Sequence, residues 1–238
     1  MNTAYLVLCI LLSSDPQVRT LTGYAESKEG VALYELRQRE VWSSGAWTQR
    51  SVSGRRPDGQ EFFRQVITPG QRAAVPNISM TYNGSQKGFS VSWRDGVVEM
   101  SFTNPKGDTI KNSLKDPPNN LVGPGGILAA IRKDWKALKD GKTLAWKMIV
   151  PPKADAYSVR LVPKGIEDID GTRALRVTLE ADNWIVRLVA PSTDFWIDLE
   201  HRSTLRYFGM GASDNPSGLP QEAFIKFKPP MLPVIPPR

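Results

Sequence analysis

The sequence predicts a mainly β protein: a large, antiparallel, strongly curved sheet that forms a half-barrel or open barrel, with one amphipathic helix. Three observations lead to this fold class. Apolar and polar residues alternate with a period of two along most of the chain after residue 20, three Asp-Gly pairs separate such runs, and one segment has helical periodicity instead. We expect curvature because strand twist curls large sheets.

The length of 238 residues and the hydrophobic content of 40% predict a single β domain over 15–228. Before it, residues 4–12 form an unbroken apolar run, which is the length of a signal-peptide core and shorter than the roughly 18 residues that a transmembrane helix needs. We therefore predict a signal segment at 1–14 and a location in the periplasm or outside the cell. A buried first strand is the alternative.

The period of two is clearest in two segments. In the first, Tyr34 and Leu36 lie on one face of the predicted strand, while Glu35 and Arg37 lie on the other. The same alternation runs through 174–181. The predicted strands are 20–27, 31–42, 46–53, 60–67, 77–82, 88–94, 97–103, 143–149, 155–163, 173–181, 184–189, 194–199, 203–208 and 222–227.

Three Asp-Gly pairs lie between these strands: Asp58-Gly59, Asp95-Gly96 and Asp170-Gly171. Asp-Gly favours the centre of a two-residue type I′ hairpin, in which both positions have positive φ. Strands joined in this way are antiparallel neighbours, so the sequence predicts a long meander.

Residues 127–139 break the strand pattern and predict one amphipathic helix. Its apolar positions are Ile127, Leu128, Ile131, Trp135 and Leu138. The segment follows a glycine-rich loop at 123–126, which we interpret as a loop-to-helix turn and not as a phosphate loop, and it ends at Gly141, a residue suited to a left-handed C-cap. We expect this helix, or a lid, to cover the concave face of the sheet.

The last ten residues, 229–238, contain five prolines and cannot continue a sheet. We predict an extended proline-rich tail. A proline-rich docking peptide is the alternative.

The residues available for chemistry are few. One cysteine and one histidine exclude an intrachain disulfide and a thiolate zinc cluster, and they leave little for Ser-His-Asp catalysis. We interpret His201 as a turn residue and predict no catalytic residue, no metal site and no cofactor. The remaining enzyme hypothesis is a metal-independent hydrolase that uses the carboxylates of Asp194, Asp198 and Glu200.

The net charge of +7 lies mainly in the middle of the chain, where the predicted helix carries a basic face. We expect this face, formed by Arg132, Lys136 and Lys139, to be solvated or to contact a membrane surface. No nucleic-acid partner is predicted. A stacking platform would need aromatic residues on one face, whereas Phe62 and Phe63 are consecutive and are expected to point to opposite faces.

Seven tryptophans are present, and four of them lie in the second half of the chain. They either form core or line an apolar cavity between the sheet and the helix, where a hydrophobic ligand would be held by buried area. The candidate cavity-lining residues are Trp135 on the helix, with Trp184 and Trp196 on strands.

Several short motifs resemble a family of uncharacterised exported bacterial proteins over about 20–228. They are Leu21-Thr22-Gly23-Tyr24-Ala25, Leu33-Tyr34-Glu35, Arg56-Pro57-Asp58-Gly59-Gln60-Glu61, the helix around Trp135, Phe195-Trp196-Ile197-Asp198 and Leu205-Arg206-Tyr207-Phe208-Gly209. No activity comes with this family. The architecture of the second half is also similar to the LolA/LolB lipoprotein carriers, whose open half-barrel is closed by several helices over an apolar, lipid-binding concavity, whereas this chain has one predicted helix.

The function predicted from these observations is a non-enzymatic cell-envelope protein that binds an apolar or lipid-like ligand in the concavity of its sheet. Two alternatives stay open at this point: an envelope protein-interaction module without a small ligand, and the carboxylate hydrolase.

Overall fold

The computed structural model describes residues 16–188, 191–214 and 220–228. The predicted signal segment at 1–14 and the proline-rich tail at 229–238 lie outside these residues. The strands are β1 (Gln17–Glu26), β2 (Ala32–Ser43), β3 (Ala46–Arg55), β4 (Glu61–Arg72), β5 (Val75–Tyr82), β6 (Gly88–Arg94), β7 (Val97–Thr103), β8 (Thr109–Leu114), β9 (Leu121–Val122), β10 (Leu144–Val150), β11 (Asp155–Ile169), β12 (Thr172–Ala181), β13 (Thr193–Asp198), β14 (Thr204–Asp214) and β15 (Pro220–Phe227). The helices are α1 (Ile127–Lys133), α2 (Trp135–Lys139), α3 (Trp184–Arg187) and the 3-10 turn η1 (Pro151–Lys153).

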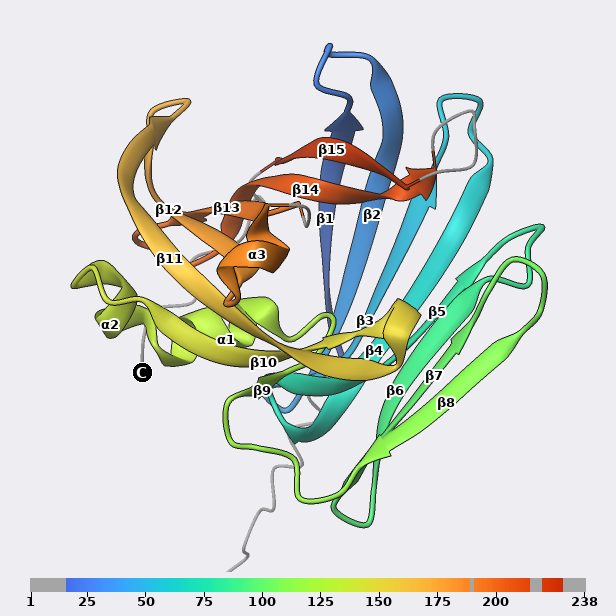
Figure 1. Ribbon diagram of the computed structural model, residues 1–238. Coiled ribbons are helices and arrows are strands. Elements are labelled where there is room, and N and C mark those ends of the chain that lie inside the picture. The colour runs from blue at the N-terminus through green and yellow to red at the C-terminus, as the bar shows by residue number, and fades with distance from the viewer. Residues whose placement is uncertain (1–15, 189–190, 215–219, 229–238) are drawn as a thin grey trace, which may run out of the picture.

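All fifteen strands form one sheet in the order β8-β7-β6-β5-β4-β3-β2-β1-β15-β14-β13-β12-β11-β10-β9. Neighbouring strands are antiparallel, apart from the short parallel pair of β9 and β10. The sheet curls strongly, and its two end strands, β8 and β9, do not pair with each other (Figure 1). The predicted fold class, a mainly β chain with a strongly curved open sheet, is confirmed.

Most predicted strands coincide with observed ones, and the exceptions have local causes. The strand β8 was not predicted because nearly all of its side chains are exposed, so it has no alternation to detect. The strand β9 is only two residues long. The strand predicted at 184–189 is wrong: the Asn183 side chain accepts a 2.8 Å hydrogen bond from the backbone N–H of Ile185 and caps the one-turn helix α3.

The predicted type I′ geometry is confirmed at 95–96 and 170–171, where both residues have positive φ. It is wrong at the first Asp-Gly pair, where only Gly59 has positive φ. There the Asp58 side chain accepts a 2.9 Å hydrogen bond from the backbone N–H of Gln60, which stabilises a longer turn.

The predicted helix is present as two short helices with a kink at Asp134, whose φ of −103° and ψ of 21° are not helical. Backbone hydrogen bonds nevertheless continue on both sides of the kink. The predicted apolar face is confirmed: Ile131, Trp135 and Leu138 are buried in the core. The predicted left-handed C-cap is confirmed at Gly141, with a φ of +80°.

The face of the sheet that contacts α1 and α2 is called the inner face below. On β10 to β13 it carries Trp146, Leu161, Val177 and Phe195, which form one core cluster with the two helices. On the first half of the sheet it carries a second cluster that includes Tyr34. Register connects the two halves, because Phe195 pairs with Tyr207, Tyr207 with Ile225, Ile225 with Ala25 and Ala25 with Tyr34.

The last two strands of the sheet are buried on both sides. Val122 and Trp146 contact the helices, whereas Leu121 and Ile149 contact Ile67 and other residues on the inner face of β4 to β7. The turn η1 also contacts β6 and β7. The sheet is therefore rolled, with its β9–β10 end lying against the inner face of its own first half (Figure 1).

A loop of four residues, 123–126, holds this rolled end in place. The backbone N–H of Gly123 donates a 2.8 Å hydrogen bond to the carbonyl of Ala74 in the β4–β5 turn. A Cβ on Gly126 would overlap the same carbonyl oxygen, so the close approach requires glycine there. Arg72 adds a second tie, since its two terminal nitrogens donate to the carbonyls of Pro117 and Pro118. The glycine-rich loop is a turn that leads into α1, as predicted, and it is in addition a packing contact.

Phe62 and Phe63 do not point to opposite faces, contrary to the expectation. Both are buried in the cluster around Tyr34, with ring centroids 5.0 Å apart. A bulge between Gly54 and Arg55 shifts the register of β3 against β4, and both rings occupy the space that a side chain on Gly54 would fill. Their rings are 3% exposed and therefore do not form a surface on which bases could stack.

Replacing Gly126 with alanine is expected to destabilise the fold by about 1–3 kcal/mol, because the added Cβ overlaps the carbonyl of Ala74. Gly123→Ala is the matched control, since its Cβ meets Val75 Cγ1 at an ordinary 3.4 Å. Urea unfolding of both variants measures the difference. Equal stability of the two variants would contradict the role of the loop.

Candidate functional site

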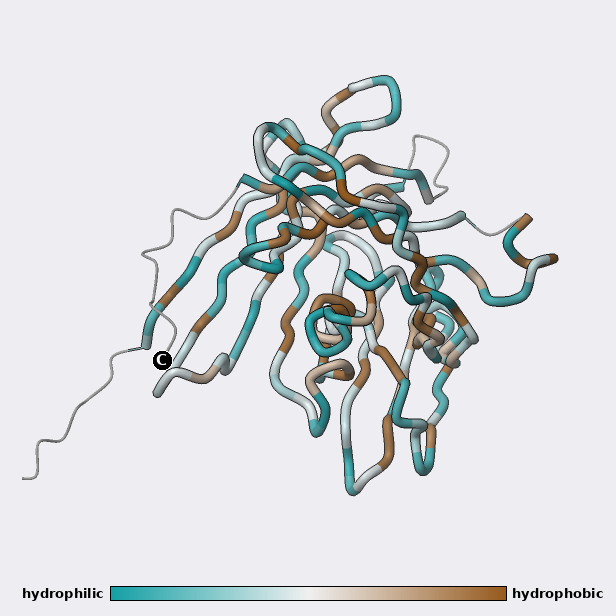
Figure 2. Tube along the Cα trace, turned by 90° about the vertical axis from the view of Figure 1, so that its left-hand side faces the viewer, coloured by the Kyte–Doolittle hydropathy of each residue, from teal (hydrophilic) through white to brown (hydrophobic). Residues whose placement is uncertain are grey.

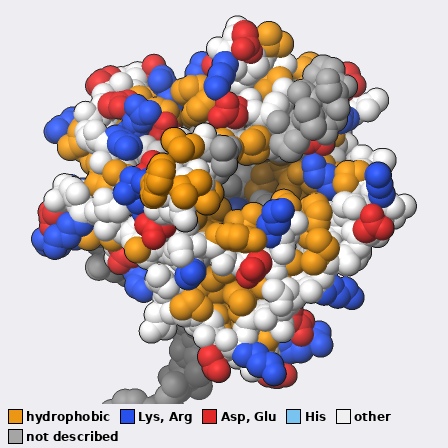
Figure 3. Space-filling model, viewed as in Figure 1, with side chains coloured by type: hydrophobic (Ala, Val, Ile, Leu, Met, Phe, Trp, Pro, Cys, Tyr) orange, Lys and Arg blue, Asp and Glu red, His pale blue; other side chains and the backbone are white. Residues whose placement is uncertain are grey.

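A hollow opens on the inner face of the sheet. Figure 3 shows it near the centre of the molecule, bordered by hydrophobic side chains, in the region where Figure 1 draws β14 above and β11 with η1 below. On β2, β3, β5, β6 and β14 the inner face of the sheet has apolar side chains that the core does not bury completely. They are Leu36, Val52, Tyr82, Phe89 and Tyr207. This partly exposed apolar surface is the candidate binding site, and it is called the inner apolar surface below.

Two glycines shape the inner apolar surface around Leu36. Gly23 on β1 and Gly54 on β3 both pair with Leu36. A Cβ on Gly23 would come within 3.0 Å of the Phe227 ring, and one on Gly54 would overlap the Phe63 ring. The rings of Phe227 and Phe63 therefore occupy the space above the two glycines, on either side of Leu36.

Polarity increases along the inner face toward the start of β1. On β2, Gln38 and Glu40 follow Leu36 on the same face. Glu40 pairs with Arg19 on β1 and with Arg50 on β3. The nitrogens Nε and Nη2 of Arg50 both lie 2.8 Å from Oε1 of Glu40. The side-chain amide of Gln38 donates to the same oxygen at 3.1 Å. The apolar surface thus ends at a charged row.

The three tryptophans predicted to line a cavity lie in three different places. Trp135 is 6% exposed and belongs to the core beneath α2. Trp196 is equally buried but lies on the outer face of β13, where its Nε1 donates a 2.7 Å hydrogen bond to Glu167 and Arg176 stacks on its ring. Trp184 is 64% exposed on α3. The structure therefore does not bring these residues together around one cavity, because strand alternation and the α3 turn separate them.

The short helix α3 carries a cluster of exposed apolar side chains. Four of the five residues from 184 to 188 are apolar and have 43–74% of their surface exposed: Trp184, Ile185, Val186 and Leu188. Arg187 turns back to the sheet, where its Nη1 lies 3.4 Å from Glu180. Figure 3 shows hydrophobic side chains gathered beside the hollow where Figure 1 places α3, and Figure 2 shows this segment extending away from the sheet.

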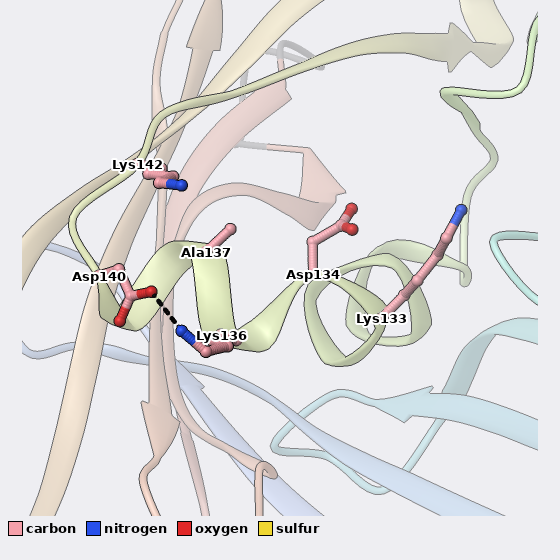
Figure 4. Close-up of a pocket in the computed structure, with 6 residues that line it drawn as sticks. All are labelled: Lys133, Asp134, Lys136, Ala137, Asp140 and Lys142. Atoms are coloured by element: carbon pink, nitrogen blue, oxygen red, sulfur yellow. Dashed lines mark hydrogen bonds and ion pairs between the residues drawn. The ribbon is translucent and has the colours of Figure 1, made fainter.

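The basic helix face divides into two environments. Lys136 and Lys139 are exposed on α2, and Lys136 forms a 3.0 Å ion pair with Asp140 that lowers the pKa of this carboxyl group. They border a shallow, open depression of about 300 Å³ that is lined by Lys133, Asp134, Lys136, Ala137, Asp140 and Lys142 (Figure 4). Arg132 instead contacts the turn between β13 and β14, where its Nε donates a 2.9 Å hydrogen bond to the carbonyl of Arg202.

The carboxylates of the hydrolase hypothesis are already engaged. Asp194 accepts hydrogen bonds from Arg176 at 2.8 Å and from Thr178 at 2.5 Å. Asp198 accepts from the backbone N–H of Glu200 at 2.7 Å and lies 3.0 Å from Nδ1 of His201. Four residues along a strand separate Asp194 and Asp198 by roughly 13 Å, too far to act on one atom. Within the described ranges, no group of three His, Cys, Asp or Glu residues could hold a metal ion.

Asp198 and His201 shift each other's titration. Burial alone would raise the pKa of Asp198. The hydrogen bonds that Asp198 accepts from N–H groups of Glu200 and His201 lower this pKa below its usual value. The hydrogen bond and the negative charge of Asp198 raise the pKa of His201. His201 lies in the turn between β13 and β14, as predicted, and the pair ties this turn to the end of β13.

Sequence reasoning missed the residues that form the inner apolar surface and the charged row. Leu36 and Val52 look like ordinary core positions of alternating strands, and Arg19, Glu40 and Arg50 look like ordinary surface charges. The only available signal was register: once β1, β2 and β3 are aligned as hairpins, these five residues fall on one face.

No family model and no curated protein matches the chain. Among solved structures, it is similar to a β-barrel-like protein of the domain of unknown function DUF1849 from Brucella abortus, with 10% identity, a TM-score of 0.49 and coverage of 90% of this chain and 95% of that one. It is also similar to a DUF1329 family protein from Desulfovibrio piger, with 11% identity and a TM-score of 0.27, and to a candidate outer membrane lipoprotein-sorting protein domain from Vibrio parahaemolyticus, with 7% identity and a TM-score of 0.28. Each of these two matches covers 93% of this chain and 87% of the other. The resemblance stated from the sequence reappears in these matches.

In the described part of the chain, no helix has the length and apolar content to cross a bilayer.

The different positions of Trp135 and Trp184 predict opposite effects of truncation. Trp135→Ala should cost about 3–5 kcal/mol of unfolding free energy because it empties a buried site beneath α2. Trp184→Ala should change stability by less than about 0.5 kcal/mol because the side chain is mostly exposed. Guanidinium unfolding of both variants tests this, and comparable losses would refute the assignment of α3 as an exposed element.

The pair of Asp198 and His201 predicts a specific pH response. Because the folded-state pKa of His201 is raised and that of Asp198 is lowered, the stability that this pair contributes is fully present between their unfolded pKa values, about 3.9 for Asp and about 6.5 for His. It is lost as pH rises through the folded pKa of His201 or falls through the folded pKa of Asp198. Asp198→Asn should lower the pKa of this single histidine, measured by an NMR titration of its ring. Glu200→Gln is the control and should have a smaller effect, since Glu200 acts only through its charge.

Proposed function

We propose that this chain is a non-enzymatic cell-envelope protein that binds an apolar or lipid-like ligand in the concavity of its curved sheet. The observation that supports the proposal most directly is the inner apolar surface. Leu36, Val52, Tyr82, Phe89 and Tyr207 are only partly buried, although they face the inside of the molecule. A hydrophobic ligand over these side chains would gain binding energy in proportion to the apolar area that it removes from water.

The neighbouring α3 segment supports the same proposal. Its four exposed apolar side chains lie beside the hollow, where a ligand entering from another hydrophobic environment would first meet the protein. Exposed apolar groups of this size are unusual on a monomer surface unless they contact a partner, a membrane or a ligand. We propose that α3 forms the entrance. The basic face predicted from the sequence comprises Arg132, Lys136 and Lys139. We keep the proposed membrane contact for Lys136 and Lys139, whose side chains face solvent on α2.

A protein-interaction module is the second candidate, and the edge strand β8 favours it. This strand pairs only with β7 and leaves its other edge free among the described strands. Ile110 on this strand is 51% exposed. An open edge can accept a strand from another chain through backbone hydrogen bonds. A partner that binds β8 would leave the hollow and any ligand in it unaffected.

Native mass spectrometry of the protein purified from its own envelope fraction tests the first candidate. A bound lipid or other apolar molecule should appear as an added mass that disappears on denaturation. A bare polypeptide that captures one protein partner, and gains no thermal stability from a lipid panel, would favour the second candidate.

Site-directed variants make the test specific to the inner apolar surface. Val52→Asn should weaken binding of the uncharged probe N-phenyl-1-naphthylamine by about tenfold, because it puts a polar group where the ligand buries a valine. Val41→Asn is the matched control: it makes the same change on the opposite face of the neighbouring strand β2. Equal affinity of the two variants, measured by fluorescence titration, would place the ligand elsewhere.

A further inference from the structure

The charged row at one end of the inner face has more positive charge than its contacts neutralise. Arg19, Glu40 and Arg50 are cross-strand neighbours on β1, β2 and β3. Arg50 pairs with Glu40, whereas Arg19 has no ion-pair partner among the described residues and stacks on Trp42, with its Cζ 4.6 Å from the ring centre. One carboxylate therefore faces two guanidinium groups.

A third guanidinium group, that of Arg132 on α1, lies close enough to the row for the charges of Arg50 and Glu40 to act on it. The pKa of Arg132 is lowered, first by burial and then by the positive charge of Arg50, with the charge of Glu40 opposing the shift. Its Nε is held by the carbonyl of Arg202, which brings the charge of Arg202 close as well. Of these three arginines, Arg50 has an ion-pair partner, whereas Arg19 and Arg132 have none among the described residues.

A buried hydrogen-bond donor, the indole N–H of Trp47, lies on a residue next to the charged row. The indole N–H of Trp47 is buried and donates to no acceptor among the described residues. Trp47 pairs with Trp42, and the Cζ of Arg50 lies 5.3 Å from its ring centre. A buried donor without a partner costs free energy, and the cost disappears when an acceptor binds. The row thus has an unpaired guanidinium group, that of Arg19, and Arg50 lies against a ring whose N–H has no acceptor among the described residues.

These groups match the oxygens of an anion. A guanidinium group donates in a fixed fork that fits carboxylate and phosphate oxygens, and hydrogen bonds to charged groups are stronger than neutral ones. The row is also continuous with the inner apolar surface: Gln38 donates to Glu40, and Leu36 lies two residues further along β2. An apolar chain over Leu36 and Val52 would bring a group attached to its end to the row.

We propose that Arg19, Arg50, Arg132 and the indole N–H of Trp47 bind the carboxylate or phosphate headgroup of an amphiphile whose chain lies over the inner apolar surface. This proposal rests on the proposed function and adds the chemical class of the ligand. The partner that it excludes is a wholly uncharged lipid, which would leave the positive charge and the Trp47 donor unused.

Isothermal titration calorimetry with three probes, each below its critical micelle concentration, tests the proposal. Dodecyl phosphate carries both the chain and the anion, dodecyl maltoside carries the chain alone, and inorganic phosphate carries the anion alone. We expect dodecyl phosphate to bind at least about tenfold more tightly than either of the others, since it alone uses both parts of the site.

Two pairs of variants locate the anion. Arg19→Gln and Arg132→Gln should each weaken dodecyl phosphate binding by about tenfold and leave dodecyl maltoside unchanged. The controls remove the same charge nearby: Arg39→Gln lies next to Glu40 on the opposite face of β2, and Lys133→Gln follows Arg132 on α1. Each control should change dodecyl phosphate binding by less than about twofold, because Arg39 lies on the other face of β2 and Lys133 borders the depression beside α2.

The outcomes separate the two proposals. Equal affinity for dodecyl phosphate and dodecyl maltoside, or equal losses in the variants and their controls, would overturn the headgroup assignment and leave apolar binding intact. Inorganic phosphate that binds as tightly as dodecyl phosphate would also overturn it, because the site would then take a free anion. Binding of neither amphiphile would overturn the proposed function itself.

Discussion

The structure depends on how a single open sheet of fifteen strands buries its own end. A sheet of this length leaves two terminal strands, and the β9–β10 end is buried against the inner face of β4 to β7. The contact is possible because the loop at 123–126 can approach the carbonyl of Ala74 to a distance that no side chain permits. Everything nearer the centre follows from this: α1 and α2 are carried into the concavity, and the core divides into clusters on either side of β9 and β10. The inner apolar surface is the part of the concavity that these elements do not fill.

Much of this fold could be predicted from the sequence, because strand alternation and turn residues act locally. The segment 173–181 alternates cleanly and forms β12, and Gly141 ends α2 as a left-handed cap. The failures are local as well. β8 has no buried face and hence no pattern, and α3 was mistaken for a strand because its apolar run hides the cap at Asn183. Phe62 and Phe63 do not alternate between the two faces, because β3 has a bulge at Gly54 opposite them and Gly54 has no side chain to occupy the space. That Gly54 lies opposite these rings is known only once the strands are paired.

The candidate site was harder to predict, since it depends on which strands become neighbours. Tryptophan was a reasonable marker of an apolar cavity, yet Trp135 supports the helices from beneath and Trp196 is part of a polar network with Glu167 and Arg176 on the outer face. Alternation assigns each residue to one of two faces but does not say which face is concave, nor which parts of the concave face stay open. Those properties come from the rolled end of the sheet, whose position is fixed by contacts between residues far apart in the chain.

The change from apolar to charged side chains along the inner face favours a ligand with an apolar part and an anionic part. A concavity evolved only to be filled by its own side chains gains nothing from arginines at its border, of which only Arg50 has an ion-pair partner among the described residues. Nor does a purely electrostatic site need the partly exposed Leu36 and Val52 beside it. The two features are consistent with each other if one molecule spans both, with an apolar part over β2 and β3 and an anion at Arg19, Arg50 and Arg132. On this view the exposed apolar helix α3 and the charged row have separate tasks: α3 meets the apolar part of the ligand at the entrance, and the row fixes the direction in which the ligand lies.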